Sequence, residues 1–398
     1  VAAYNKAISI KPDYAEAYSN VGIAFIEQER LEDGLAALNK AISIKPDYSE
    51  AYSNKGNALV QQGKLTDAID AYKHALKLDP NCHASIEDFL TLRYQLDDSK
   101  LIQTTTPTQL FKSDYKIEKR PKFHILNAIQ AFLTENISLT HKYIQNFNEC
   151  DPKLFNLLKP RDKVFCVAFA NFLNKLIEMP FNDTDKYETG NFIYHLGESH
   201  CLSYAHRIIN MHSIKYKVYP KIVFGAKAFH FSKKGHNSYK TIMKVHIASI
   251  PKKSEVFVSI GEIDCRPEEG FIVAAEKQNK SIKEIISITV KDYLKWFAEH
   301  NKDQNHNIHF LNLPAPVYDK KHDKVINAQV ASTVALFNMF FAQNIVLHDF
   351  NLIDVFKITV GKNGFSNNFF HIDNRHLSPR TITEIEPQIN RLQDKVQF

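Results

Sequence analysis

Cysteine is scarce in this sequence, and its few copies lack the spacing of a disulfide framework or a metal site. The chain of 398 residues has five cysteines, an odd number, scattered and without a Cys-x-x-Cys pair. This usage argues against a small disulfide-bonded fold and against a cysteine-based zinc site. We therefore expect a protein of a reducing compartment, the cytoplasm. The cysteines are Cys82, Cys150, Cys166, Cys201 and Cys265.

The sequence also lacks a dense basic block, a long apolar run and a signal peptide. Because no cluster of lysine and arginine is interleaved with aromatic residues, the net charge of +6 indicates compositional bias, and we expect no nucleic-acid partner. No uninterrupted apolar stretch approaches the roughly 20 residues that cross a bilayer, so we expect no membrane span. The chain begins inside a repeat, and an earlier N-terminus is expected to be missing.

The repeat has a period of 34 residues, set by Pro12, Pro46 and Pro80. Lys-Pro-Asp-Tyr at residues 11–14 recurs at 45–48. The pattern resembles the tetratricopeptide repeat, a pair of helices in which small residues allow close approach and proline closes the second helix. We assign residues 1–98 to this all-α solenoid, with its first repeat truncated. The other recurring positions are Tyr18 and Tyr52, Gly22 and Gly56, and Ala41 and Ala75.

Two asparagines occupy equivalent places in these repeats. Asn20 and Asn54 each lie two residues before a recurring glycine. The resemblance implies that such asparagines clamp the backbone of an extended peptide through their side-chain amides. The alternative is that they are ordinary hydrated residues of a helix surface. The first interpretation predicts a protein partner for the repeats.

The rest of the chain, whose length exceeds that of most single cores, divides into three parts. Residues 99–122, rich in threonine, lysine and proline, are interpreted as a linker, and 123–185 as a helical bridge. Residues 186–398 alternate β-rich and helical runs, which predicts a three-layer α/β domain with a parallel sheet covered on both faces. The expected strands are Phe192–Leu196, Val218–Phe224, Val256–Ile260, Ile308–Leu313 and Phe369–Ile372. The expected helices include His124–Asn136, Asp162–Glu178, His200–Asn210 and one from Ser378 to about Gln397.

Three short blocks in this last part carry the residues of a nucleophilic site. Ser199 in Gly-Glu-Ser-His follows an apolar run and precedes a helical pattern, so it is expected on a strand-to-helix turn whose N–H groups face the group it attacks. Asp373 and His376 are three residues apart, so one loop can carry a general base and the acid that orients it. Between these blocks lies Gly-Glu-Ile-Asp-Cys-Arg at residues 261–266.

These blocks, in this order, resemble the SGNH/GDSL hydrolase superfamily over about the C-terminal half of the chain. The resemblance implies a flavodoxin-like fold and a triad of Ser199, His376 and Asp373. It also implies oxyanion or substrate-binding roles for block residues, which in this chain are Gly225, Gly261, Asp264, Arg266 and His200. The Gly-x-Ser-x-Gly template of α/β-hydrolases fails, because Cys201 replaces its second glycine.

The chain departs from the family at one oxyanion donor. The family uses an asparagine side chain where this sequence has Ile263, which donates no hydrogen bond. Arg266 could supply the missing positive charge; alternatively it forms an ion pair with Asp264 or Glu262. Glu198, in place of the family's aspartate, is interpreted as structural, and His200 is expected to line the mouth of the pocket.

Histidines near the serine also raise the question of a metal. Those concerned are His195, His200 and His206, with His371 and His376 farther along the chain. His200 and His206 are six residues apart on an expected helix, without a carboxylate-rich surrounding, so no metal and no cofactor is expected. His371 competes with His376 for the role of base but lies on the wrong side of Asp373. Cys201 and Cys265 are expected to be core packing.

Together these features predict a serine esterase that removes an acyl group, by resemblance an acetyl group, from a carbohydrate or glycan, while its repeats recruit a protein partner. One alternative is an O-acyltransferase of surface-polysaccharide assembly that uses the same residues. Another is a non-catalytic repeat scaffold with a degenerate hydrolase domain, which the missing asparagine favours.

Overall fold

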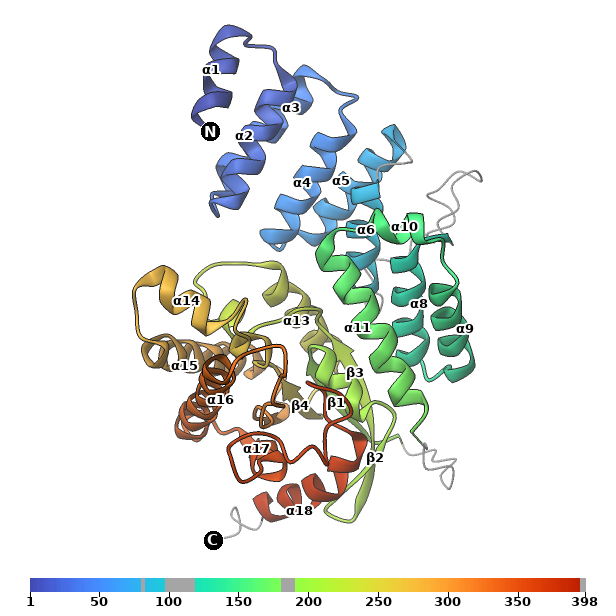
Figure 1. Cartoon of the computed structure of the whole chain (residues 1–398), viewed down its shortest axis with the longest axis vertical. Helices are drawn as coiled ribbons and strands as arrows, with labels where there is room; N and C mark the ends of the chain where they lie inside the picture. The colour runs from blue at the N-terminus through green and yellow to red at the C-terminus, as the bar shows by residue number, and fades with distance from the viewer. Residues whose placement is uncertain (80–82, 97–118, 180–189, 394–398) are drawn as a thin grey trace. The chain divides into compact units, whose positions relative to one another are not determined.

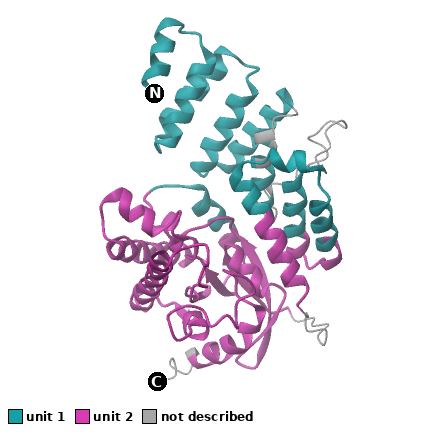
Figure 2. Ribbon diagram, viewed as in Figure 1, with its two compact units in different colours: residues 1–130, 140–166, 235–245 teal, residues 131–139, 167–234, 246–398 magenta. Residues whose placement is uncertain are grey.

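The computed structural model describes residues 1–79, 83–96, 119–179 and 190–393 (Figure 1). The chain divides into two compact units (Figure 2). Unit 1 comprises residues 1–130, 140–166 and 235–245, and unit 2 comprises residues 131–139, 167–234 and 246–398. The predicted linker lies outside the described residues from 99 to 118, and Pro121 already begins a helix.

The repeats of unit 1 are helix pairs, as their period predicts. Gly56 shows why a small residue recurs: a Cβ atom there would lie 2.5 Å from the Tyr72 ring of the paired helix, so only glycine fits. Residues 1–12 contain a single helix, as expected for the second half of a truncated repeat. The helices are α1 (Ala2–Ile10), α2 (Ala15–Glu27), α3 (Leu31–Ile44), α4 (Ser49–Gln61), α5 (Leu65–Leu78) and α6 (His83–Leu96).

Within residues 119–179 the structure has four helices, where the sequence predicts two. The predicted ones are α8 (Pro121–Leu133) and α11 (Pro160–Ile177), and the others are α9 (Ile137–Asn148) and α10 (Pro152–Asn156). Asp151 caps α10 by accepting the N–H of Lys153 at 2.8 Å, and Pro152 occupies its first position. The C-terminal part of α11, from residue 167, belongs to unit 2.

Unit 2 is built on a mixed, mostly parallel sheet of six strands in the order β2-β3-β1-β4-β5-β6. Only β2 is antiparallel; it pairs with β3 as a hairpin. Its strands are β1 (Phe192–Gly197), β2 (Ile208–Met211), β3 (Ile214–Ile222), β4 (Glu255–Ser259), β5 (Asn307–Leu311) and β6 (Asn351–Ile353). The prediction of a parallel sheet is thus corrected at one edge.

Helices lie on both faces of this sheet, as the alternation predicts. On one face, Phe257 of β4 packs with Ile385 and Ile389 of α18 (Ile382–Gln393). On the other, the Phe310 ring of β5 contacts aromatic rings of α15 (Ile282–Asn301) and α16 (Lys324–Ile345). Both faces of the sheet are therefore buried in aromatic and aliphatic core. The shorter helices are α12 (Ala228–Ser232), α13 (Ser238–Ser249), α14 (Phe271–Gln278) and α17 (Val355–Thr359), with the 3₁₀ helices η2 (Ser199–Tyr204), η3 (Ile263–Cys265) and η4 (Pro379–Thr381).

Within the described residues, α16 is the one helix long and apolar enough to cross a membrane, with a mean hydropathy of 1.5 over its most apolar window. Its side chains Phe337 and Phe341 are buried in unit 2, and Asn338 bonds both the N–H and the carbonyl of Leu313. One such helix does not establish a membrane span. These contacts pack one side of α16 against unit 2.

Two predicted elements are wrong. The helix expected over His200–Asn210 is the short helix η2 followed by strand β2, and between them His206 adopts a left-handed backbone with φ of 63°. The strand expected over Phe369–Ile372 is a loop with one isolated bridge between His371 and Leu377, and the last strand is β6 instead. The last helix is described to Gln393, and residues 394–397 lie outside the described part.

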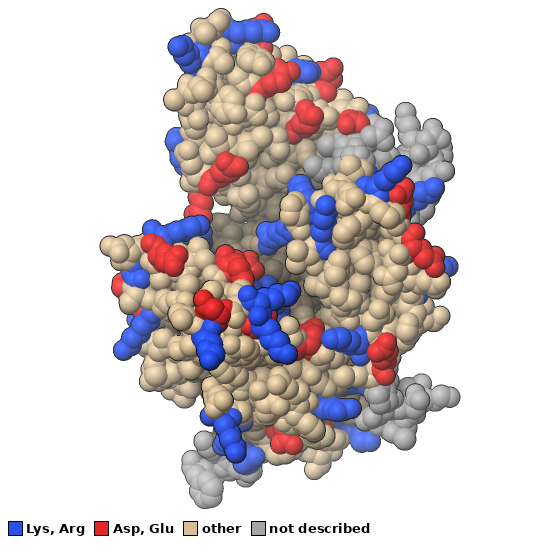
Figure 3. Space-filling model, viewed as in Figure 1, with Lys and Arg blue, Asp and Glu red and all other residues tan. Residues whose placement is uncertain are grey.

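The charges on the surface are of both signs. On the face in view in Figure 3, lysine and arginine side chains are interspersed with aspartate and glutamate rather than gathered into one continuous basic area. This distribution agrees with the absence of a dense basic block in the sequence.

Candidate active site

The candidate site lies at the carboxyl edge of the sheet, where the strand order reverses. β1 ends at Gly197 and is flanked by β3 and β4, so Ser199, Gly225 and Gly261 all follow the ends of adjacent parallel strands. In open α/β sheets, ligands bind at the carboxyl ends of strands at such a reversal. The φ of Gly261 is 136°, and a Cβ there would lie 2.9 Å from the Phe337 ring, so this bend requires glycine.

The three predicted triad residues come together. Ser199 Oγ lies 2.8 Å from Nε2 of His376, and His376 Nδ1 lies 2.8 Å from Oδ2 of Asp373. The other carboxylate oxygen of Asp373 accepts the backbone N–H groups of Arg375 and His376 at 2.8 and 2.7 Å. Burial raises the pKa of Asp373, but the hydrogen bond and charge of His376 outweigh it, so the pKa lies below its usual range. The carboxylate therefore stays ionised and fixes the imidazole.

Two residues of α11 contact the loop that carries Asp373 and His376, and the sequence predicts neither contact. The Phe172 ring stacks on the His376 ring, with centroids 3.8 Å apart and an interplanar angle of 15°. The Lys175 ammonium donates to the carbonyl of Ile372 at 3.1 Å. The apolar period of α11 predicts that one face of the helix is buried. It does not predict that this face packs against the loop of Asp373 and His376. The interpretation of residues 123–185 as a bridge is therefore incomplete.

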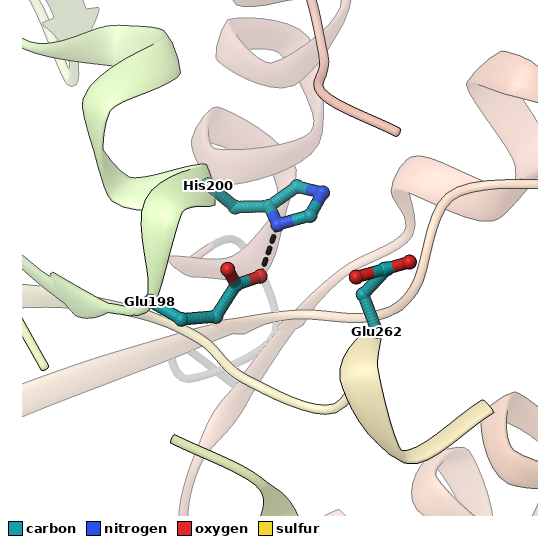
Figure 4. A group of neighbouring side chains, drawn as sticks. All are labelled: Glu198, His200 and Glu262. Atoms are coloured by element: carbon teal, nitrogen blue, oxygen red, sulfur yellow. Dashed lines mark hydrogen bonds and ion pairs between the residues drawn. The ribbon is translucent and has the colours of Figure 1, made fainter. Parts of the chain in front are cut away.

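A second acid–imidazole pair contacts the serine from the other side. Glu198 Oε2 lies 2.6 Å from Ser199 Oγ, and its other oxygen bonds Nδ1 of His200 (Figure 4). His200 Nε2 lies 3.0 Å from the carbonyl of Arg375, so it donates into the triad loop. Burial lowers the pKa of His200, but the Glu198 carboxylate outweighs it and raises the pKa to about 9. His200 is thus a buried imidazolium, not a residue of the pocket mouth.

The serine hydroxyl has one proton and two neighbouring acceptors. Burial raises the pKa of Glu198, but the charge of His200 outweighs it and leaves the pKa below its usual range. A carboxylate of low pKa holds a hydroxyl without removing its proton. Glu198 therefore orients Ser199, while His376 is the group placed to take the proton.

The same glutamate and histidine belong to a group of possible metal ligands. Glu198, His200 and Glu262 offer ligand atoms within 4.8 Å of one another (Figure 4). Both ring nitrogens of His200 are engaged, however, and Glu262 pairs with Arg266. As arranged here, the histidine offers no lone pair to an ion. The other nearby histidines bond the protein, His195 to Ser259, His206 to Phe132 and His371 to Ser366.

The residues predicted to bind an oxyanion offer backbone N–H groups. The N–H groups of Ser199 and Gly225 have no acceptor within the described residues, as expected at the start of a helix and in a tight turn. Ile263 is buried. Both oxygens of Asp264 accept backbone N–H groups of α12, from Ala228 at 2.7 Å and Phe229 at 3.1 Å. Asp264 therefore ties the loop after β4 to the segment after β3.

Arg266 forms the ion pair that was one of its two predicted roles. Its Nε lies 3.0 Å and its NH2 2.6 Å from Oε2 of Glu262, and NH1 lies 3.2 Å from Glu269. Burial lowers the pKa of Arg266, but the Glu262 carboxylate outweighs this and raises the pKa above its usual range. The guanidinium therefore holds a nearly buried carboxylate beside the site.

Replacing Arg266 by methionine is expected to destabilise unit 2 by about 3 kcal/mol, because it leaves the Glu262 carboxylate unpaired. For a domain of this size the melting temperature should fall by roughly 6–12 °C. Thermal unfolding followed by circular dichroism measures the change. The double variant Arg266→Met/Glu262→Gln should recover part of the loss. An unchanged melting temperature with kcat lowered about 10²-fold would instead give Arg266 the oxyanion role.

The asparagines of the repeats lie where the period predicts. Asn20 is an exposed residue of α2, and Asn54 lies on the equivalent helix α4. The Asn54 amide nitrogen is 3.5 Å from the hydroxyl of Ser19, the neighbour of Asn20 in the chain. The two positions therefore follow one another along successive first helices of the repeats.

Comparisons with known proteins agree with the repeats. The tetratricopeptide repeat family matches residues 49–82, and the TPR repeat family matches residues 22–63. The chain is also similar to the crystal structure of YrrB, described as a TPR protein with an unusual peptide-binding site. That similarity has 19% sequence identity and a TM-score of 0.28, and covers 43% of this chain and 92% of the other. A search of curated proteins gave no match. The two family matches show tetratricopeptide repeats in the N-terminal region, which confirms the prediction of such repeats.

Proposed function

We propose that unit 2 is a serine esterase of the SGNH/GDSL type that removes an acetyl group from a carbohydrate. The observation that carries the proposal is the chain of hydrogen bonds from Ser199 through His376 to Asp373. The topology supports the proposed family, because without β2 the strand order β3-β1-β4-β5-β6 is that of a flavodoxin-like sheet. Triads recur on unrelated folds, so the geometry carries more weight than the topology.

The proposed mechanism follows from the positions of the atoms. His376 Nε2 takes the hydroxyl proton as Ser199 Oγ attacks the acetyl carbonyl, and Asp373 stabilises the imidazolium. The N–H groups of Ser199 and Gly225 bind the oxyanion. His376 then returns the proton to the departing sugar oxygen, leaving an acetyl ester on Ser199. Water, activated by the same imidazole, releases acetate and restores the serine.

Labelling by a fluorophosphonate tests the nucleophile, and acetate release tests the reaction. The protein is expected to form an adduct at Ser199 and to release acetate from an O-acetylated oligosaccharide in water. Transfer of the acetyl group to an added sugar, in preference to water, would favour the O-acyltransferase alternative. Absence of both the adduct and acetate release from a folded protein would favour the scaffold alternative.

We further propose that the repeats bind an extended peptide of a protein partner. Tetratricopeptide repeats support a protein partner in general, and the aligned amides of Asn20 and Asn54 support a peptide backbone as the ligand. Peptides selected from a library on the full chain should lose about 10-fold or more in affinity for Asn20→Ala/Asn54→Ala, by loss of two amide contacts. Asn39→Ala, an exposed asparagine on the second helix α3, is the matched control. Equal losses in both variants would refute the clamp.

A further inference from the structure

A pocket adjoins the loop that carries Asp373 and His376. It has a volume of about 260 Å³ and lies wholly within unit 2. One wall is the triad loop itself, through Asn374 and Arg375, and another is the segment after β5, including residues 313–317. The pocket thus adjoins the loop that carries the histidine next to Ser199. This volume is slightly below the roughly 300 Å³ at which typical small-ligand sites begin, so it suits a small group rather than a whole ligand.

Hydrogen bonds fix the backbone of Arg375, whereas its side chain forms none with the described residues. Its N–H donates to Asp373 at 2.8 Å, and its carbonyl accepts from His200 at 3.0 Å. The residue is exposed, and its guanidinium has no hydrogen bond or ion pair with the described residues. An arginine with a fixed backbone and a free guanidinium is suited to bidentate binding of a carboxylate or phosphate.

The acids that line the same pocket form no ion pair with Arg375. Glu262 is paired with Arg266 at 2.6 Å, and Glu268 lies 3.1 Å from the His322 imidazole. Asp319, the third lining acid, accepts the backbone N–H of Lys321 at 2.9 Å. Lys321, exposed on the pocket wall, also has no carboxylate partner for its ammonium among the described residues. Two cations of the pocket are therefore available to an incoming anion.

His371 adds a neutral donor or acceptor to the pocket lining. Its Nδ1 lies 2.7 Å from the Ser366 hydroxyl, which also accepts the N–H of Asn368 at 2.9 Å. Because the hydroxyl oxygen has two lone pairs and one proton, it can accept from or donate to Nδ1, and either ring nitrogen of His371 can carry the proton. Burial lowers the pKa of His371 to about 4, so the ring is neutral at pH 7. A neutral imidazole adds no charge to the pocket, so its positive charge comes from Arg375 and Lys321.

We infer that this pocket binds an anionic group, carboxylate or phosphate, on the acylated sugar, so that the substrate is an acidic carbohydrate. This inference rests on the proposed esterase function. Arg375 binds the anion. Because its backbone is bonded to Asp373 and His200, the bound anion positions the ester next to Ser199.

The test compares O-acetylated glucuronic acid, O-acetylated glucose 6-phosphate and O-acetylated glucose as substrates of the full chain. One charge-assisted contact is worth about 10–100-fold in kcat/KM, so at least one anionic ester should be preferred over the neutral one by that factor. The larger preference of the two identifies carboxylate or phosphate as the bound group. Arg375→Gln should reduce the ratio of anionic to neutral substrate towards one, with the loss appearing in KM.

Arg380→Gln is the matched control, because this exposed arginine follows the triad loop but does not line the pocket, and its ratio should not change. Raising the ionic strength should lower the preference of the native protein. Equal kcat/KM for all three esters, or a ratio that Arg375→Gln leaves unchanged, overturns this inference alone. If no ester is hydrolysed, or if Ser199→Ala hydrolyses them as fast as the native protein, the proposed esterase function is wrong. This inference is then wrong as well.

Discussion

Replacement of Ser199 by alanine is expected to reduce the kcat for a short-chain aryl ester by on the order of 10⁴–10⁶. The hydroxyl is the group that His376 contacts at 2.8 Å, and alanine leaves no atom there to form the acyl intermediate. The fluorophosphonate adduct should disappear in the same variant. Initial rates and intact-protein mass spectrometry measure the two effects.

Ser203 provides a matched control on the same short helix. Its side chain is buried, and its hydroxyl has no hydrogen-bond partner in the described residues. Ser203→Ala removes an unsatisfied polar group and should leave turnover near that of the native protein. If Ser199→Ala retains activity, or if both variants lose it equally, Ser199 is not the nucleophile.

The parts of the fold that the sequence predicts best are those set by local repetition. A period of 34 residues marks helix pairs that each require a small residue at the crossing, and Gly56 against Tyr72 shows the physical reason. Strands β1 and β4 are likewise predicted within two residues, because they are central strands and read as apolar runs. Their ends then locate Ser199 and Gly261 at one edge of the sheet.

The elements that the sequence does not predict depend on tertiary contacts or on backbone geometry. The apolar period after His200 fits a helix, but the left-handed backbone at His206 turns the chain into the edge strand β2. The apolar residues at Phe369 suggest a strand, yet Phe369 is 63% exposed and the segment is a loop that carries the base. The first segment thus forms an edge strand where a helix is predicted, and the second forms a loop where a strand is predicted.

In the candidate site, too, some contacts are predicted by the sequence and others are not. The order of the blocks predicts which serine, histidine and aspartate come together. It does not predict Phe172 on the ring of His376, because that contact joins residues 204 positions apart that share no motif. Nor does it predict the pair of Glu198 and His200, in which an expected structural acid and an expected pocket residue form a buried ion pair beside the nucleophile.

Replacement of His376 by alanine is expected to be about as damaging as Ser199→Ala, on the order of 10⁴–10⁶ in kcat. The imidazole is the proposed base; it contacts the hydroxyl and is held between Asp373 and the Phe172 ring. Asp373→Asn should cost somewhat less, on the order of 10⁴, because asparagine keeps the shape of the loop but stabilises the wrong tautomer. Steady-state rates on the same aryl ester measure both.

The double variant His376→Ala/Asp373→Asn should be hardly slower than His376→Ala alone, because a carboxylate that acts only through the imidazole loses its role when the imidazole is gone. Additive losses would mean that Asp373 acts independently of His376. His348→Ala is the control for removing a histidine side chain, because His348 lies outside all three blocks. If His371→Ala is the inactivating change and His376→Ala is not, the base has been assigned to the wrong histidine.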